Sequence, residues 1–161
     1  MKQAVFAGTF DPVTNGHLDL MRRALKVVDH LTVAVAMRPE KGVLFSQGER
    51  VALIEEAMRG EARFKVEPFS GLLVDFARSR KIAIIIRGLR FISDFEYEFQ
   101  MALMNRRLDD SVETLFLMPS ETYTYLNSSL VKEIASAGGP VAGFVPPHVD
   151  AALKAKLGAR R

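Results

Sequence analysis

The sequence of 161 residues contains no cysteine and only three histidines. The absence of cysteine excludes disulfides, thiolate metal sites and cysteine nucleophiles, and it fits a reducing compartment such as the cytoplasm. The histidines show no His-x3-His spacing, so no metal site built from protein side chains is expected. Eleven glycines and seven prolines are too few for a fibrous or low-complexity chain. We therefore expect a globular cytoplasmic protein without thiol chemistry.

Long apolar runs are also missing. The longest candidate, residues 82–86, has five residues, whereas a membrane span needs about 18–20. The first eight residues lack the extended apolar segment of a secretory signal. We therefore expect no membrane partner. The length corresponds to one domain over residues 1–161, with a frayed tail at about 158–161.

Acidic residues are only slightly outnumbered, 19 against 22 basic residues, which gives a net charge of +3. The basic excess is local and suits an anionic ligand, and a phosphate-bearing small molecule satisfies it as well as a nucleic acid does. No RNA-recognition motif or aromatic stacking pattern is present, so no nucleic-acid partner is expected. The C-terminal cluster is interpreted as a solvated tail. The basic clusters are Arg78, Arg80, Lys81, Arg87 and Arg90, and then Lys154, Lys156, Arg160 and Arg161.

Apolar runs typical of strands alternate with segments of helical periodicity. This alternation predicts a Rossmann-like, doubly wound α/β fold, in which a five-stranded parallel sheet carries helices on both faces. Right-handed crossovers favour the strand order 3-2-1-4-5. Strands are predicted at 3–7, 31–37, 64–68, 82–86 and 114–118. Helices are predicted at 15–28, from a Ser46 cap to Gly60, and at 71–80, 94–108, 128–137 and 146–157.

The fourth predicted helix is the longest. Asp94 is a suitable N-cap for it, and the helical spacing of its apolar residues predicts one buried face. That face would contain Phe95, Phe99, Ala102 and Leu103.

Ligands of such sheets bind beyond the carboxyl ends of the strands, where the strand order reverses. In the predicted order this point lies between the first and fourth strands. The loops that follow Ala7 and Ile86 are therefore the candidates for a functional site.

The first loop, Gly8–His17, is neither a P-loop nor a Gly-x-Gly-x-x-Gly fingerprint. It joins a strand to a helix N-terminus, where free N–H groups and the helix dipole favour an anion. Gly8 allows close approach of the backbone, Thr9 supplies a hydroxyl, and the His17 imidazole can donate to phosphate oxygens. The alternative is that Thr14 or Asn15 merely caps the helix and His17 is a surface histidine.

The second loop is Arg87-Gly88-Leu89-Arg90. Arginine forks bind phosphate oxygens in bidentate fashion, and this loop is expected beside the first. The alternative is that both arginines form ion pairs within the chain, with Asp94, Glu96 or Glu98.

The third segment runs from Tyr123 to Ser129 and precedes another predicted helix. Its two serines could hold phosphate at that helix N-terminus, or the segment could be an ordinary cap. Lys41, in a polar loop, is either a phosphate contact or solvated. His30 and His148 are interpreted as surface or helix-terminal residues. Magnesium carried by a polyphosphate needs few protein ligands.

Four motifs together resemble those of the phosphopantetheine adenylyltransferase family. The stretch Thr14-Asn15-Gly16-His17 is similar to the Thr/His-x-Gly-His motif of the nucleotidyltransferase superfamily. Arg87-Gly88-Leu89-Arg90, followed by Asp94-Phe95-Glu96-Tyr97-Glu98, is what resembles this family in particular. The other two motifs are Gly8-Thr9-Phe10-Asp11-Pro12 and Ser128-Ser129-Leu130-Val131-Lys132-Glu133.

The resemblance implies transfer of an adenylyl group from ATP to 4′-phosphopantetheine, which gives dephospho-coenzyme A and pyrophosphate. It further implies Mg²⁺, a homohexamer and feedback by coenzyme A. Thr9, Lys41, Leu73 and Arg87 would contact phosphopantetheine. Thr9, Phe10, His17, Gly88, Leu89, Arg90, Glu98, Tyr123, Thr124, Tyr125, Leu126, Asn127, Ser128 and Ser129 would contact ATP.

The nucleophile in this reaction is a phosphate that is already anionic, so no general base is needed. Catalysis would rest on positioning and on charge stabilisation at the α-phosphoryl group. His17 would stabilise the transition state and Thr9 would align the attacking phosphate. Lys41 and Arg87 would offset the repulsion between the two anionic substrates, and Arg90 is a further candidate catalytic residue.

Two other functions remain open from the sequence. Another nucleotidyltransferase, such as a nicotinamide mononucleotide adenylyltransferase or a cytidylyltransferase, would share the first loop and differ in its acceptor pocket. A nucleotide-binding module without activity would keep the phosphate site but would not require His17.

Overall fold

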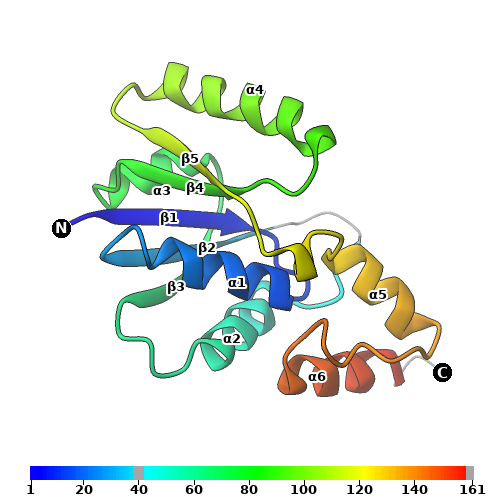
Figure 1. Ribbon diagram of the computed structural model, residues 1–161. Coiled ribbons are helices and arrows are strands. Elements are labelled where there is room, and N and C mark those ends of the chain that lie inside the picture. The colour runs from blue at the N-terminus through cyan, green and yellow to red at the C-terminus, as the bar shows by residue number, and fades with distance from the viewer. Residues whose placement is uncertain (38–41, 159–161) are drawn as a thin grey trace.

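Five parallel strands form one sheet in the part of the chain that the structure, a computed structural model, describes: residues 1–37 and 42–158. The sheet order is β3-β2-β1-β4-β5, which confirms the predicted order. β1 lies at the centre, and α4 and β5 lie toward one edge of the molecule (Figure 1). The strands are β1 (Gln3–Gly8), β2 (His30–Ala36), β3 (Phe64–Phe69), β4 (Ile84–Gly88) and β5 (Glu113–Leu117).

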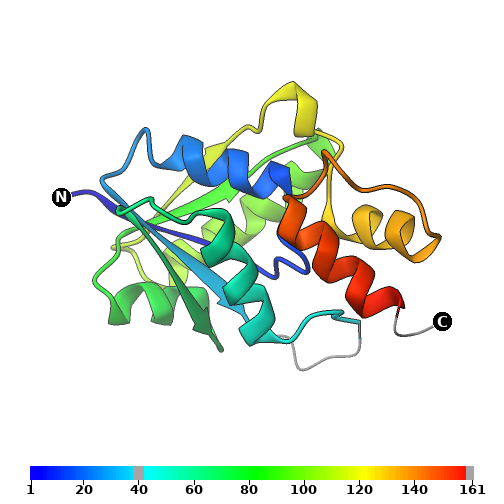
Figure 2. The same ribbon diagram turned by 90° about the horizontal axis from the view of Figure 1, so that it is seen from below.

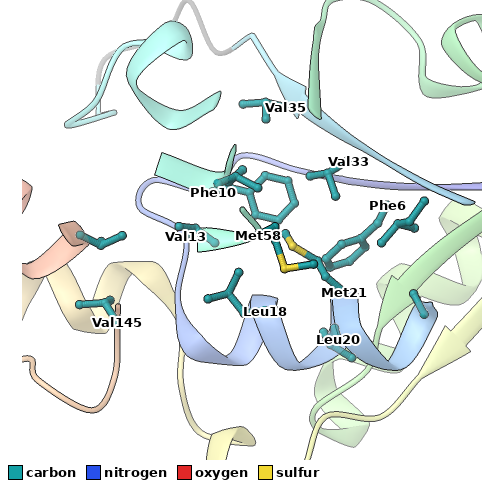
Figure 3. Packing of buried hydrophobic residues seen from close by; sticks show 14 of the residues in the cluster. Phe6, Phe10, Val13, Leu18, Leu20, Met21, Val33, Val35, Met58 and Val145 are labelled. Atoms are coloured by element: carbon teal, nitrogen blue, oxygen red, sulfur yellow. The ribbon is translucent and has the colours of Figure 1, made fainter. Parts of the chain in front are cut away.

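Alternate residues of the central strand enter two separate cores, as expected for a sheet that is covered on both faces. Ala4 and Phe6 pack with α1 (Asn15–Ala24), α2 (Gln47–Ala57), α5 (Ser128–Ser136) and α6 (Pro147–Gly158), and Val5 and Ala7 pack with α3 (Leu73–Ser79). Figures 1 and 2 show α5 and α6 side by side at one end of the molecule. Figure 3 shows the first core, in which Phe6, Phe10 and Met21 are buried.

The apolar face predicted for the fourth helix is not buried. In α4 (Ile92–Leu108), Phe95, Phe99 and Leu103 are 48%, 46% and 46% exposed. Apolar residues occur on every side of this helix, so their spacing could not indicate which side meets the sheet. Within α4 only Glu98 is classed as buried.

The cap predicted for α4 is also wrong. The helix begins at Ile92, two residues before Asp94, and its N-cap residue Phe91 makes no side-chain cap hydrogen bond. Asp94 instead accepts weak hydrogen bonds from the backbone N–H and Nε of Arg90, at 3.4 and 3.3 Å.

Several element boundaries differ from the prediction. The first helix ends at Ala24 rather than at residue 28, and α2 ends at Ala57 rather than at Gly60. β4 covers 84–88 rather than 82–86, because Ile82 closes the turn after α3 by donating to the Ala77 carbonyl at 3.0 Å. Arg87 and Gly88 are therefore the last two residues of the strand, not part of the following loop.

The remaining differences are small. The third helix is shorter than predicted, Leu73–Ser79, and Leu72 before it is exposed. Within the described ranges, no helix has the length and apolar character needed to cross a membrane.

Candidate active site

Two adjoining cavities lie beyond the carboxyl ends of β1 and β4, at the predicted reversal of strand order. We name them the His17 cavity, of about 250 Å³, and the Leu73 cavity, of about 380 Å³. Ala7, Gly8, Arg87 and Glu98 line both. The His17 cavity is also lined by Phe10, Thr14, Gly16, His17, Gly88, Arg90, Asp94, Tyr123, Leu126 and Asn127, and the Leu73 cavity by Thr9, Leu72, Leu73, Tyr97, Met101 and Asn105.

The His17 ring is oriented by the cap of its own helix. Thr14 is the N-cap of α1, and its hydroxyl accepts the backbone N–H of His17 at 3.3 Å. In return, His17 Nδ1 accepts the backbone N–H of Thr14 at 3.0 Å. Because Nδ1 is an acceptor, the proton of the neutral ring must be on Nε2. Among the described residues Nε2 has no protein partner, so it is available as a donor to a ligand.

Burial keeps this ring neutral. Desolvation, with a smaller contribution from the positive charge of Arg90, lowers the pKa of His17 from 6.5 to about 4. The unfolded chain therefore takes up a proton at His17 below about pH 6.5, whereas the folded chain does so only near pH 4. This group thus destabilises the fold progressively as the pH falls from 6.5 toward 4. Near pH 7 the ring is a neutral donor.

Arg87 lies between the two cavities. Its Nε and Nη2 donate to the Glu98 carboxylate at 2.8 and 2.6 Å, and its Nη1 donates to the Ala7 carbonyl at 2.8 Å. The hydrogen bonds to Glu98 raise the pKa of Arg87 above its ordinary value. A guanidinium has five N–H donors, so two remain for a ligand. Arg87 therefore forms the ion pair that the sequence left open as an alternative, and it lines both cavities as well.

Arg90 connects the second loop with the third segment. Its Nη1 donates to the Leu126 carbonyl at 3.2 Å, and its Nε faces Asp94 at 3.3 Å. Leu89 makes a sheet-like hydrogen bond to Leu117 at 2.9 Å and does not line the His17 cavity. Gly88 is close to Leu20: a Cβ at Gly88 would lie 2.5 Å from Leu20 Cδ1.

The third segment meets the first loop at the N-terminus of α5. Asn127 caps this helix by accepting the N–H of Leu130 at 2.8 Å, and the Ser128 hydroxyl donates to the Pro12 carbonyl at 2.7 Å. Two helix N-termini, those of α1 and α5, therefore border one cavity, which favours an anion there. Of the candidates in this segment, Tyr123, Leu126 and Asn127 line the cavity, whereas Thr124, Tyr125, Ser128 and Ser129 do not.

The other candidates divide between the two cavities. Thr9 and Leu73 line the Leu73 cavity, and Glu98 lines both. The Phe10 ring is only 3% exposed. Lys41 lies outside the described residues, as do residues 159–161 of the predicted frayed tail.

Three charged residues that support the site, Asp11, Lys132 and Arg50, were assigned no role from the sequence. Asp11, 3% exposed, accepts the N–H groups of Leu44 and Phe45 at 2.8 and 2.9 Å and pairs with Lys132 at 2.7 Å. Arg50 is fully buried, which its residue type alone does not indicate, because most arginines are exposed.

Arg50 joins three segments at the edge of the site. Its side chain donates to the carbonyls of Thr9 at 2.6 Å, Ala36 at 2.9 Å and Phe45 at 3.1 Å. These hydrogen bonds hold Thr9 beside the ends of β1 and β2.

In the described part of the chain, no group of three or more His, Cys, Asp or Glu side chains could hold a metal ion.

Comparison with known proteins is consistent with this geometry. The cytidylyltransferase-like family model matches residues 5–134. The phosphopantetheine adenylyltransferase of Geotalea daltonii is 53% identical over 157 residues, 98% of each chain. The phosphopantetheine adenylyltransferase of Opitutus terrae is 50% identical over 99% of this chain and 100% of its own. That from Alkaliphilus oremlandii is 54% identical over 95% and 98%.

A solved structure from Vibrio parahaemolyticus, provisionally assigned as a nicotinate-nucleotide adenylyltransferase, has the same fold. Its TM-score is 0.66 at 15% identity, over 96% of this chain and 92% of that one. The family match and the relatives of about 50% identity over nearly the full length decide the classification. This chain belongs to the cytidylyltransferase-like nucleotidyltransferases and, within them, to the phosphopantetheine adenylyltransferase family.

Proposed function

We propose that the chain transfers the adenylyl group of ATP to the phosphate of 4′-phosphopantetheine, and so forms dephospho-coenzyme A and pyrophosphate. The names of its relatives support this reaction. The observation that carries the proposal is the neutral His17 ring, whose Nε2–H borders a cavity between two helix N-termini. A second cavity adjoins it, so that a nucleotide and an acceptor can meet at the shared wall.

In this proposal the acceptor phosphate attacks the α-phosphorus of ATP directly. The attacking oxygen is already anionic, so no side chain has to remove a proton. His17 Nε2–H donates to a non-bridging oxygen of the α-phosphoryl group, where negative charge increases in the transition state. A neutral donor fits this role because it keeps its proton at pH 7. The N-termini of α1 and α5, with Arg90, hold the triphosphate.

The Leu73 cavity is the proposed acceptor site. Leu73, Tyr97 and Met101 offer apolar surface to the pantetheine arm, while Thr9, Arg87 and Lys41 bind and align its phosphate. The remaining nucleotide contacts are proposed to come from Phe10, Gly88, Leu89, Glu98 and the segment 123–129. We propose that the triphosphate is bound together with Mg²⁺, which would offset its charge.

We further propose cytoplasmic location, feedback by coenzyme A, and assembly into a homohexamer. Coenzyme A contains the same pantetheine arm as the acceptor, so it can occupy the same cavities. Assembly is supported by an exposed apolar surface on α4 and the end of β5, which we name the α4 surface. Large exposed patches of this kind mark interaction sites. Its members include Phe95, Phe99, Leu103, Met104, Leu108, Leu115 and Met118.

Placing two carboxylates on the α4 surface is expected to break the assembly. Met104 and Leu108 are 56% and 49% exposed and lie one turn apart on α4. The double variant M104E/L108E should elute with a smaller mass in size-exclusion chromatography with light scattering, because charges in an apolar interface lose solvation. V27E, an equally exposed apolar position after α1, serves as control. An unchanged mass for M104E/L108E would contradict a contact through this surface.

Loss of Arg87 is expected to weaken binding of the acceptor more than that of ATP. For R87A we expect the KM for 4′-phosphopantetheine to rise about 10- to 100-fold, as charged hydrogen bonds are lost, with a smaller effect on the KM for ATP. R87A also leaves the buried Glu98 carboxylate unpaired, so R87A/E98Q is the control. Unchanged KM and kcat in R87A would remove this residue from the site.

The proposed reaction is tested by pyrophosphate release. The purified protein is mixed with ATP and Mg²⁺, and with 4′-phosphopantetheine, nicotinamide mononucleotide or no acceptor. Release with phosphopantetheine alone supports the proposal. Release with the mononucleotide alone would keep the reaction class and overturn the acceptor. No release with either, in protein that binds ATP, would indicate a binding module.

A further inference from the structure

The Phe10 side chain is part of the wall that encloses His17. Its ring is 3% exposed and packs edge-on against the imidazole, with ring centroids 5.0 Å apart and an interplanar angle of 80°. It also packs against Phe6, with ring centroids 5.6 Å apart. Figure 3 shows the Phe10 ring in this core, near Phe6 and Val33.

The backbone of Phe10 is strained. Its φ angle is +51°, in the left-handed region that non-glycine residues seldom adopt. Such strain persists only where the surrounding structure holds it, and it is concentrated at functional sites. Here the conformation turns a large aromatic ring inward, at a loop position where glycine would be less strained.

Gly8 allows the Phe10 ring to take this position, because the ring occupies the space that a side chain at position 8 would need. A Cβ at Gly8 would lie 2.9, 3.1 and 3.2 Å from three atoms of the ring. Phe6 and His17 lie against the ring, so a side chain at position 8 would displace the ring from these contacts. Position 8 therefore has to be glycine while Phe10 remains in place.

From these contacts we infer that Phe10 is a positioning residue for His17: its ring, seated over Gly8, holds the imidazole in the orientation that the Thr14 N–H selects and keeps water from the side of the imidazole that it covers. The inference deepens the proposed function and rests on it for the role of His17 in catalysis. The hydrogen bond from Thr14 fixes one point of the imidazole. The Phe10 ring restricts its rotation about that point, so that Nε2–H stays directed into the cavity.

The exclusion of water has a measurable consequence. Since burial is the main cause of the low pKa of His17, removing the aromatic wall should raise that pKa toward 6.5. The charged and titratable groups that share the cavity stay unchanged in the variants proposed here. They are Arg87, Arg90, Asp94, Glu98 and Tyr123.

The test is the titration of His17 by NMR in the full chain, which is simplified because there are only three histidines. For F10L we expect the pKa of His17 to rise by about one unit or more, together with a kcat about tenfold lower. G8A should act in the same direction by displacing the ring, and it provides a second route if F10L folds poorly. F76L is the matched control, because Phe76 is 7% exposed in the opposite core.

The result expected is a shifted His17 titration in F10L and G8A and an unshifted one in F76L. An unchanged pKa in folded F10L, or an equal shift in F76L, would overturn the inference. The titration does not depend on activity. If the native protein failed to release pyrophosphate with any acceptor, the proposed function would fall, whereas the NMR result would still decide whether Phe10 holds His17.

Discussion

Replacing His17 with alanine is expected to lower kcat by about 10²–10³-fold, the usual effect of removing one donor that stabilises a transition state. The KM for ATP should change by no more than about threefold, because the interaction is made mainly in the transition state. The reason is structural: the Nε2–H of a neutral, half-buried ring borders the cavity at the N-terminus of α1.

The control for this variant addresses the second role of His17, which is part of the α1 cap. H17A loses one cap hydrogen bond, which costs about 1 kcal/mol of stability, so its folding is checked by circular dichroism and thermal unfolding. H30A, at the exposed start of β2, should retain full activity. A normal kcat at saturating ATP, combined with a collapse in ATP affinity, would contradict the transition-state role.

Replacing Asp11 with alanine is expected to reduce the free energy of unfolding by about 3 kcal/mol. The substitution leaves the N–H groups of Leu44 and Phe45 without their acceptor and Lys132 without its partner. Breaking a buried pair on one side is strongly destabilising, and each unsatisfied buried group costs about 1–3 kcal/mol.

The effect of D11A should extend to the site, because Arg50 holds the carbonyls of both Phe45 and Thr9. Stability is measured by urea unfolding at one protein concentration, since association shifts apparent stability. K154M, which removes an exposed pair with Asp150 on α6, should change stability by less than about 0.5 kcal/mol. A similarly small change in D11A would show that the Asp11 contacts do not stabilise the fold.

The strand order of the sheet could be predicted because it follows from local sequence patterns. Alternation of strands and helices, with crossovers of one hand, leaves few topologies, and β3-β2-β1-β4-β5 is found. For the first helix, burial was easier to predict than the position of the helix end. Leu25 and Val28 are 5% exposed as their spacing indicates, although α1 stops at Ala24 and these residues lie in the turn after it.

At the site, the sequence posed alternatives that the structure combines. Thr14 does cap α1, yet the cap itself orients His17. Arg87 does form an ion pair, with Glu98, and it also lines both cavities. Local patterns cannot separate such roles, because one side chain can serve the helix or the ion pair and the ligand at once.

Other features depend on contacts between distant segments, and these leave no local pattern. Arg50 is buried because three carbonyls from separate segments converge on it. Phe95 and Phe99 were predicted to face the sheet, but both are exposed. The prediction failed because α4 has apolar residues on all sides, so their spacing does not indicate which side is buried. If the proposed assembly through the α4 surface is correct, the partner copy buries what one chain leaves exposed.

The most direct test of the account is the stereochemistry of adenylyl transfer. ATP with a single sulfur substitution of known configuration at the α-phosphorus is reacted with 4′-phosphopantetheine and Mg²⁺, and the configuration of the dephospho-coenzyme A product is determined. Direct attack by the acceptor, with His17 only donating a hydrogen bond, predicts product with inverted configuration. Retention would show two successive displacements through an adenylylated side chain, and it would contradict the account.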